Sequence, residues 1–169
     1  MNRTLQIQDR LTRMSSVFSE TAINCIDAVF GKRCEIHIPW QIVEQLQGQF
    51  DKIMTIGCAS NKFSAIACAG IQNDSLMSFL CEENVSSAYA SDVLGEMLNT
   101  YIGMLSDNEE YSTSFGYLSQ AVPVLYENGN SYLPFIWGIQ GYLYHENHWV
   151  YMGYSIRENL DDAGVLPEA

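Results

Sequence analysis

The chain has 169 residues, of which 47% are hydrophobic and 17% are charged. This composition excludes a disordered chain, and the length suits one domain that buries roughly two-thirds of the surface its unfolded form exposes. The formal net charge of −12 argues against nucleic acid or an anionic membrane as a partner, because both are bound through clustered Lys and Arg. No apolar run is long enough to span a membrane, and residues 1–18 lack a signal-peptide core, so we expect a cytoplasmic protein.

Motifs for a self-contained enzyme are missing from the sequence. The five cysteines form no C-x-x-C pair and lie mostly among apolar neighbours, which favours buried free thiols. His145 and His148 flank Glu146 and Asn147, a pattern more typical of a turn between strands than of a metal site. The sequence has no glycine-rich phosphate loop and no G-x-S-x-G motif. We therefore expect no metal or cofactor held by the chain itself.

Hydrophobic periodicity predicts the elements of the first half. Residues 14–30 have the spacing of an amphipathic helix, which Gly31 would end. The β-compatible runs 52–58 and 63–71 are separated by the turn-like residues 59–62, so they are expected to pair as a hairpin. Residues 74–82 predict a short helix, and a longer one begins near residues 87–91.

The second half is predicted to be rich in strands. A polar break at 106–110 precedes three β-rich segments, 118–127, 131–145 and 148–156, with loops expected at 127–131 and 145–148. These elements predict an α+β fold with long helices packed on an antiparallel sheet. The predicted organisation is an N-terminal segment at 1–13, one domain at 14–157 and an acidic C-terminal tail at 158–169.

The two longer helices resemble each other when the glycines that end them are superposed. This shift of 72 residues places 19–31 over 91–103, so that acidic Glu20 matches Asp92 and apolar Ile26 matches Leu98. Chance similarity between amphipathic helices remains an alternative. A duplicated half-domain related by a pseudo-two-fold axis is the other interpretation.

The second long helix carries an unusual polar stripe. At 100° per residue, its apolar side chains gather on one side, and the opposite side collects Asp92, Gly95, Glu96, Asn99 and Gly103. Glycine costs up to about 1 kcal/mol relative to alanine inside a helix, and asparagine is also a poor helix former. The stripe is therefore expected to serve contact with another surface. The alternative is that the glycines mark a close crossing with another helix and that Glu96 is only a solvent-exposed surface charge.

The residues of this stripe also form a recognisable pattern. Asp92-x-x-x-Glu96-x-x-Asn99, followed 24 positions later by Pro123, resembles the signature of the CheC/CheX/FliY family of chemotaxis phosphatases. That family has about 22 residues before the proline, whereas this chain has 23. The resemblance covers roughly residues 14–157. The matching positions of the first helix hold Asn24 and Asp27, so CheX-like members with one site per chain are the nearer analogy.

The resemblance implies a function in two-component signalling. It implies hydrolysis of the aspartyl-phosphate on a CheY-like receiver domain, with Asn99 orienting the attacking water and Glu96 bonding to the receiver's lysine. Mg²⁺ would belong to the phosphorylated partner. Asp92, Gly95 and Gly103 would contact that partner, Asp92 could instead cap the helix, and Pro123 would be structural. The resemblance also implies a homodimer.

Two other functions stay open at this point. The first is a non-catalytic adaptor of the same fold, which would bind a receiver or its own copies. The second is a small-molecule sensor that uses the aromatic side chains of Trp137, Tyr142, Tyr144 and Trp149, although these rings suit a sheet core equally well. The choice of receiver depends on a surface that belongs to another protein.

Overall fold

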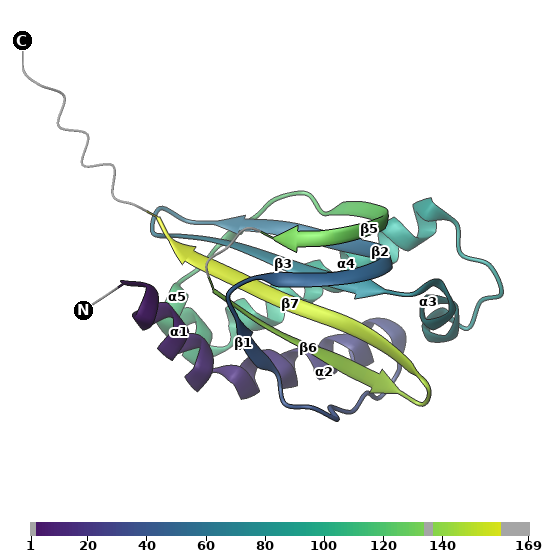
Figure 1. The fold of residues 1–169 in the computed structure, drawn as a ribbon, viewed down its shortest axis with the longest axis horizontal. Helices are drawn as coiled ribbons and strands as arrows, with labels where there is room; N and C mark the ends of the chain where they lie inside the picture. Colours follow the sequence, from purple (N-terminus) through teal and green to yellow (C-terminus); the bar gives the residue numbers. More distant parts are fainter. Residues whose placement is uncertain (1–2, 134–136, 160–169) are drawn as a thin grey trace, which may run out of the picture.

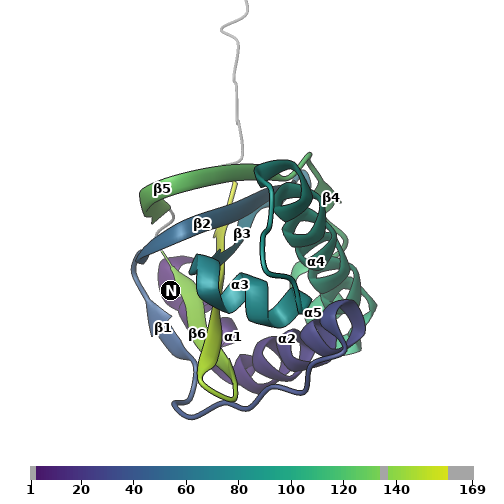
Figure 2. The ribbon, with the colours of Figure 1, turned by 90° about the vertical axis from the view of Figure 1, so that its right-hand side faces the viewer.

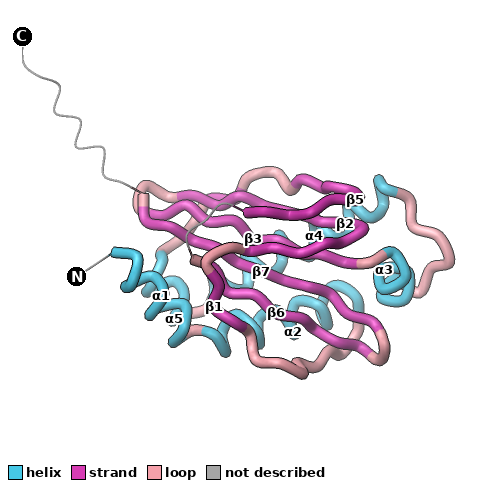
Figure 3. The backbone as a smooth tube through the Cα atoms, viewed as in Figure 1, coloured by secondary structure: helices cyan, strands magenta, loops and turns pink. Residues whose placement is uncertain are grey.

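The computed structural model describes residues 3–133 and 137–159. It consists of an antiparallel sheet with helices packed against it (Figures 1 and 3). The helices are α1 Arg3–Arg13, α2 Ser15–Phe30, α3 Asn73–Leu80, α4 Ser87–Asp107 and α5 Glu109–Phe115. The strands are β1 Gln41–Val43, β2 Leu46–Ala59, β3 Phe63–Ile71, β4 Ser119–Gln120, β5 Val124–Leu133, β6 Gly138–His145 and β7 His148–Glu158. The predicted α+β class is confirmed.

The strand order shows that the two halves of the chain are related by a pseudo-two-fold axis. The sheet runs β1-β6-β7-β3-β2, and β5 completes it by pairing with β2. Exchanging β1, β2 and β3 with β5, β6 and β7 reproduces this order in reverse, so the axis passes between β3 and β7. Every one of these pairings is antiparallel. The predicted internal repeat is therefore present in the topology.

Helices α2 and α4 lie side by side over one face of the sheet (Figure 2). Their apolar faces enter a single core with the inward side chains of the sheet, including Phe18 and Ile26 of α2 and Leu98 of α4. Gly31 ends α2 with φ 64°, a left-handed conformation that glycine adopts without steric cost. The predicted end of the first helix is thus confirmed.

The sheet curls strongly on its other face. Two residues link β1 at one end of the strand order to β2 near the other end, so the sheet must bend back toward itself. Phe50, Ile53, Cys68 and Tyr151 form a second buried cluster. The Phe50 ring stacks on Tyr151 with centroids 4.9 Å apart, and Trp149 contacts Phe50 edge-on at 6.0 Å. Aromatic residues of this region therefore serve packing.

Several elements differ from the sequence-based prediction. Helices α1 and α5 and the short strand β1 were not predicted, and the predicted β-rich segment 118–127 is divided into β4 and the start of β5. Helix α5 begins within the predicted polar break, because Asn108 accepts hydrogen bonds from the main-chain nitrogens of Glu110 and Tyr111 and so caps a new helix. The loop predicted at 127–131 is wrong, since β5 continues through it in register with β2.

The core extends beyond the predicted start of the domain at residue 14. Ile7 and Leu11 of α1 are buried and belong to the main cluster, so the segment 1–13 contributes to packing. At the other end, β7 runs to Glu158 and the main-chain nitrogen of Asn159 donates to the Lys62 carbonyl at 2.7 Å. The rest of the predicted tail lies outside the described residues.

Candidate functional site

Helix α4 presents the predicted stripe, and its start is fixed by a serine cap. Ser86 lies before the first turn, and its hydroxyl accepts from the Tyr89 main-chain nitrogen at 3.2 Å. The possibility that Asp92 caps the helix is therefore wrong, because Asp92 lies more than one turn inside it. The predicted apolar face is confirmed, since these side chains are all buried: Leu94, Met97, Leu98, Tyr101, Ile102 and Leu105.

The polar side chains of the stripe reach the surface without partners. Asp92 and Glu96 are exposed, and Asn99 is half-buried. Within the part of the chain that the structure describes, none of these three side chains makes a hydrogen bond or an ion pair. Glu96 and Asn99 are three residues apart, so they lie as neighbours one turn apart on the helix surface. Their carboxylate and amide groups remain available to a molecule outside the chain.

Gly95 does not lie on the exposed stripe as predicted. It is buried, and a Cβ atom at this position would lie 3.5 Å from Cβ and 3.6 Å from Cγ of Pro123. The side of α4 next to the stripe therefore rests on the loop that leads into β5. This contact joins two parts of the signature, Gly95 and Pro123, through packing within the chain. The prediction that Gly95 makes room for a partner is therefore wrong.

Gly103 differs from Gly95 in its surroundings. It is half-exposed, and a Cβ atom there would meet no heavy atom within 4 Å. The structure thus gives no packing reason for glycine at residue 103. Its predicted contact with a partner stays a prediction, as does that of Asp92.

The loop beside Pro123 carries exposed apolar side chains that the sequence reasoning missed. Val122 is 82% exposed and Val124 is 47% exposed. Val122 flanks Pro123, which contacts the Gly95 position on α4. Val124 pairs with Thr55, next to the pair of Met54 and Leu125 that enters the core under the helices, so its side chain points to the face of the sheet away from α4. Their position directly next to the signature proline is the signal that would have identified them.

A polar bridge ties the beginning of α4 to the sheet. Lys52 of β2 is buried, and its ammonium donates to Glu127 Oε1 at 2.5 Å. The same oxygen accepts from the Ser87 hydroxyl at 2.7 Å. These bonds, from Lys52 first and then Ser87, lower the pKa of Glu127. This support for α4 has no sequence signal, because the three residues meet only through the fold.

The equivalent surface on α2 holds different groups. Asn24 and Asp27 are both exposed, so the stripe has a counterpart without the Glu and Asn pair. Between the two helices, the Cys25 thiol donates to the Met97 carbonyl at 3.1 Å. Burial, and secondly the charge of Glu96, raise the pKa of Cys25 to about 12, which keeps this thiol protonated.

No metal-binding group is found in the described ranges, where no three His, Cys, Asp or Glu side chains gather to hold an ion. His145 and His148 pair at the end of the β6–β7 hairpin, which confirms the predicted turn. His145 Nδ1 lies 2.9 Å from the Arg33 carbonyl. This contact of His145 joins the end of the β6–β7 hairpin to the loop that follows α2.

None of the helices among the described residues is long and apolar enough to cross a membrane.

Comparison with solved structures identifies the fold. CheX from Desulfovibrio desulfuricans matches with a TM-score of 0.68 and 10% identity over 86% of this chain and 99% of that chain. CheX from Vibrio vulnificus matches with a TM-score of 0.66 and 12% identity over 83% and 96%. CheX in the CheX–CheY–BeF₃–Mg²⁺ complex from Borrelia burgdorferi gives a TM-score of 0.53 and 10% identity over 83% and 96%.

The sequence itself matches no family model and no curated protein. The middle domain of FliM from Helicobacter pylori also shares the fold, with a TM-score of 0.55 and 9% identity over 87% of this chain and 91% of that chain. Identities this low establish a common architecture, and an architecture hosts more than one function. The chain therefore has the CheC/CheX-like fold that its signature residues predict.

Proposed function

We propose that this protein is a phosphatase that hydrolyses the aspartyl-phosphate of a CheY-like receiver domain. One observation supports the proposal above others: Glu96 and Asn99 lie one turn apart at the surface of α4, without partners among the described residues. Such an arrangement is complete only when another molecule supplies the groups that they bind. The phosphorylated aspartate and Mg²⁺ would both come from the receiver.

Asn99 would act on the water that attacks phosphorus. Its carbonyl oxygen accepts and its NH₂ group donates, so the side chain can hold a water in line with the P–O bond to the aspartate. The water oxygen attacks phosphorus, the bond to the aspartate breaks, and the aspartate leaves as a carboxylate with inorganic phosphate as the other product. Positioning of this kind lowers the barrier because the entropy of orienting the water is lost before reaction.

Glu96 would dock the receiver through its lysine. A carboxylate and an ammonium form a charge-assisted bond, which is stronger than a bond between neutral groups. The sequences of α2 and α4 contain no Lys or Arg, whereas they carry Glu20, Asp27, Asp92, Glu96 and Asp107. This acidic surface favours a partner with a positive surface around its lysine and raises the rate of encounter.

The contact surface would include the loop at Pro123. Val122 exposes apolar surface in the loop that Pro123 holds against α4. Protein interfaces commonly join an apolar centre to a polar rim. The Borrelia burgdorferi CheX was solved together with CheY, which supports a CheY-like partner for a chain of this fold.

The test is the decay of phosphate from receiver domains of the same genome, phosphorylated in the presence of Mg²⁺. We expect one receiver to lose phosphate faster with the wild type, and Asn99→Ala to reduce this acceleration by about 100-fold, in line with losses from removing one positioned polar group. Asp27→Ala is the matched control, because residue 27 is the equivalent position on α2. Equal activity of wild type and Asn99→Ala would remove Asn99 from the mechanism.

An adaptor without catalytic activity is the second candidate. The FliM middle domain shows that this fold is shared with proteins that are not named CheX or CheC, and α2 lacks the Glu and Asn pair. Saturable binding of a phosphorylated receiver with an unchanged phosphate lifetime would favour the adaptor. The homodimer implied by the resemblance stays a prediction, which the molar mass in solution tests.

A further inference from the structure

Basic side chains gather around one pocket in this acidic chain, away from α4. A pocket of about 380 Å³ is lined by Arg10 and Arg13 of α1, Lys62 of the β2–β3 turn, and Glu110, Thr113 and Ser114 of α5, together with Met14. The whole chain has only eight Lys and Arg. Three of them at one pocket concentrate positive charge where the chain otherwise has little.

These three cations lack counter-ions of their own. Within the described residues, no carboxylate lies within ion-pair distance of Arg10, Arg13 or Lys62. Arg10 and Arg13 are three residues apart on α1 and so repel each other as neighbours on the helix surface. Glu110 also lines the pocket, but it forms no ion pair with the three cations. An anion from outside the chain would relieve this repulsion.

The pocket is held in shape by hydrogen bonds. Arg10 Nη1 donates to the Ser114 carbonyl at 2.9 Å, which joins α1 to α5 and leaves the other guanidinium donors free for a ligand. The turn that carries Lys62 is fixed because the Ser60 hydroxyl accepts from the main-chain nitrogens of Lys62 and Phe63 at 3.2 and 3.1 Å. The side-chain NH₂ of Asn159 also donates to the Ser60 carbonyl at 2.9 Å.

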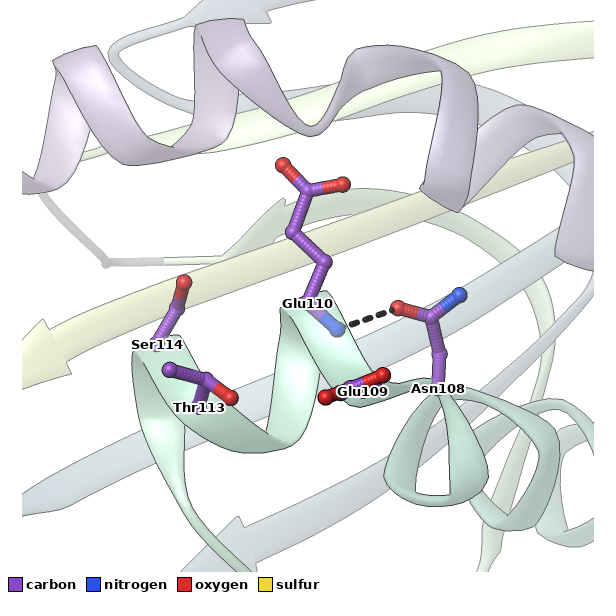
Figure 4. A pocket seen from close by; sticks show the side chains of 5 residues that line it. All are labelled: Asn108, Glu109, Glu110, Thr113 and Ser114. Carbon is purple, nitrogen blue, oxygen red and sulfur yellow. Dashed lines mark hydrogen bonds between the residues drawn. The ribbon is translucent and has the colours of Figure 1, made fainter.

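The hydroxyl groups of α5 complete the set of donors. In Figure 4 the side chains of Glu110 and Ser114 project from the same side of α5, and Glu110 points toward the purple N-terminal helices. Ser114 and Thr113 supply hydroxyls, which can donate to phosphate oxygens. Arginine suits phosphate because its planar fork donates two parallel hydrogen bonds.

We infer that this pocket binds the phosphate group of a small phosphorylated molecule. The pocket volume suits a compact anion, and Arg13, Lys62 and the fixed Arg10 surround it from two elements that are far apart in sequence. Glu110 lines the same pocket, so its negative charge limits the affinity for the phosphate. This site is independent of Glu96 and Asn99, so its test is a binding measurement and not a phosphatase assay.

The probe is inorganic pyrophosphate, titrated into the full chain by calorimetry at low salt. We expect saturable binding of one pyrophosphate, weakened about tenfold or more in Arg13→Gln and in Lys62→Gln, since a charge-assisted hydrogen bond contributes about that much. Glu110→Gln should tighten binding, because it removes the one negative charge of the pocket. Arg33→Gln is the matched control, since it removes an exposed charge elsewhere and should leave binding unchanged.

Three results would overturn the inference. The first is no saturable binding by the wild type. The second is equal weakening in Arg33→Gln, which would show attraction by overall charge only. The third is binding to vesicles that contain phosphatidic acid without binding to pyrophosphate, which would indicate a lipid surface.

Discussion

The Cys25 thiol and the Met97 carbonyl lie 3.1 Å apart across the contact between α2 and α4, and 72 residues separate them in sequence. This separation equals the shift that superposes the two helices. Equivalent positions of the two halves therefore touch each other, as they must where a pseudo-two-fold axis passes between two helices. The contact places Glu96 beside α2, where its charge acts on Cys25.

Thiol reactivity gives a first prediction. Burial raises the pKa of Cys25 and Cys68 to about 12 and that of Cys34 and Cys58 to about 11, while Cys81 is exposed. Because the thiolate is the reactive species, an aromatic disulfide reagent at pH 8 should label one thiol rapidly in the native protein and five after unfolding. Cys81→Ser should remove the rapid phase. Rapid labelling of a second thiol would contradict the buried positions.

The proposed docking by Glu96 predicts a dependence on salt. Replacing Glu96 by Gln keeps the shape of the side chain and removes its charge, so kcat/KM for the cognate phosphorylated receiver should fall about 10-fold or more, as expected for a lost charge-assisted bond. The wild-type rate should fall as salt rises, and the variant should respond less. Initial rates at two salt concentrations measure both effects. Asn24→Asp on α2, which adds a charge at the equivalent position, serves as the control and should not restore activity to Glu96→Gln.

The two glycines of α4 should behave alike in stability and differently in binding. Alanine at either position should raise the free energy of unfolding by up to about 1 kcal/mol, because glycine is a poor helix former. Gly95 has room for this change, since the new Cβ would only contact Pro123 at 3.5 Å. Urea denaturation gives the stabilities. Binding of the receiver should weaken in Gly103→Ala and stay unchanged in Gly95→Ala. Equal weakening in both variants would argue against a contact at Gly103, because the effect would then not be specific to that position.

The bridge from Lys52 through Glu127 to Ser87 predicts a pH dependence. The pKa of Glu127 is lowered in the folded protein, so the bridge stabilises the fold at neutral pH, and this contribution is lost as the pH falls below the ordinary pKa of 4.5 toward the folded value. Glu127→Gln should therefore lower Tm at pH 7, and the difference from the wild type should shrink in acid. Thermal unfolding followed from pH 7 to pH 3 measures this. A constant difference across that range would assign the effect to packing.

Strong periodicity explains what could be predicted. The helices at 15–30 and 87–107 and the hairpin of β2 and β3 have long regular patterns, and the surface positions of Glu96 and Asn99 follow from the same periodicity. Helix α1 was not predicted because most of its residues are polar. Its two core residues, Ile7 and Leu11, are one helical turn apart, which is too short a hydrophobic pattern to indicate a helix. In α5 the buried pair Tyr111 and Phe115 gave an equally short signal.

Other features depend on contacts that no local pattern records. Asn128 and Gly129 have the composition of a turn, but pairing with β2 holds them in a strand, since tertiary pairing overrides local preference. Gly95 lies at the edge of the polar stripe on a helical projection. Contacts of this position with Pro123 and with Met54 of β2, which no local pattern records, decide that this edge is buried.

The ladder between β3 and β7 has a consequence for how the chain folds. It pairs residues 63–71 with residues 150–158, so the centre of the sheet cannot form until the last strand is available. Closing so long a loop costs entropy before any contact compensates for it, which slows folding. During synthesis, β3 must wait with one edge unpaired while about eighty residues are added, at a rate of about 5–20 residues per second. In this interval the nascent chain exposes an unpaired strand edge, which can pair with another chain.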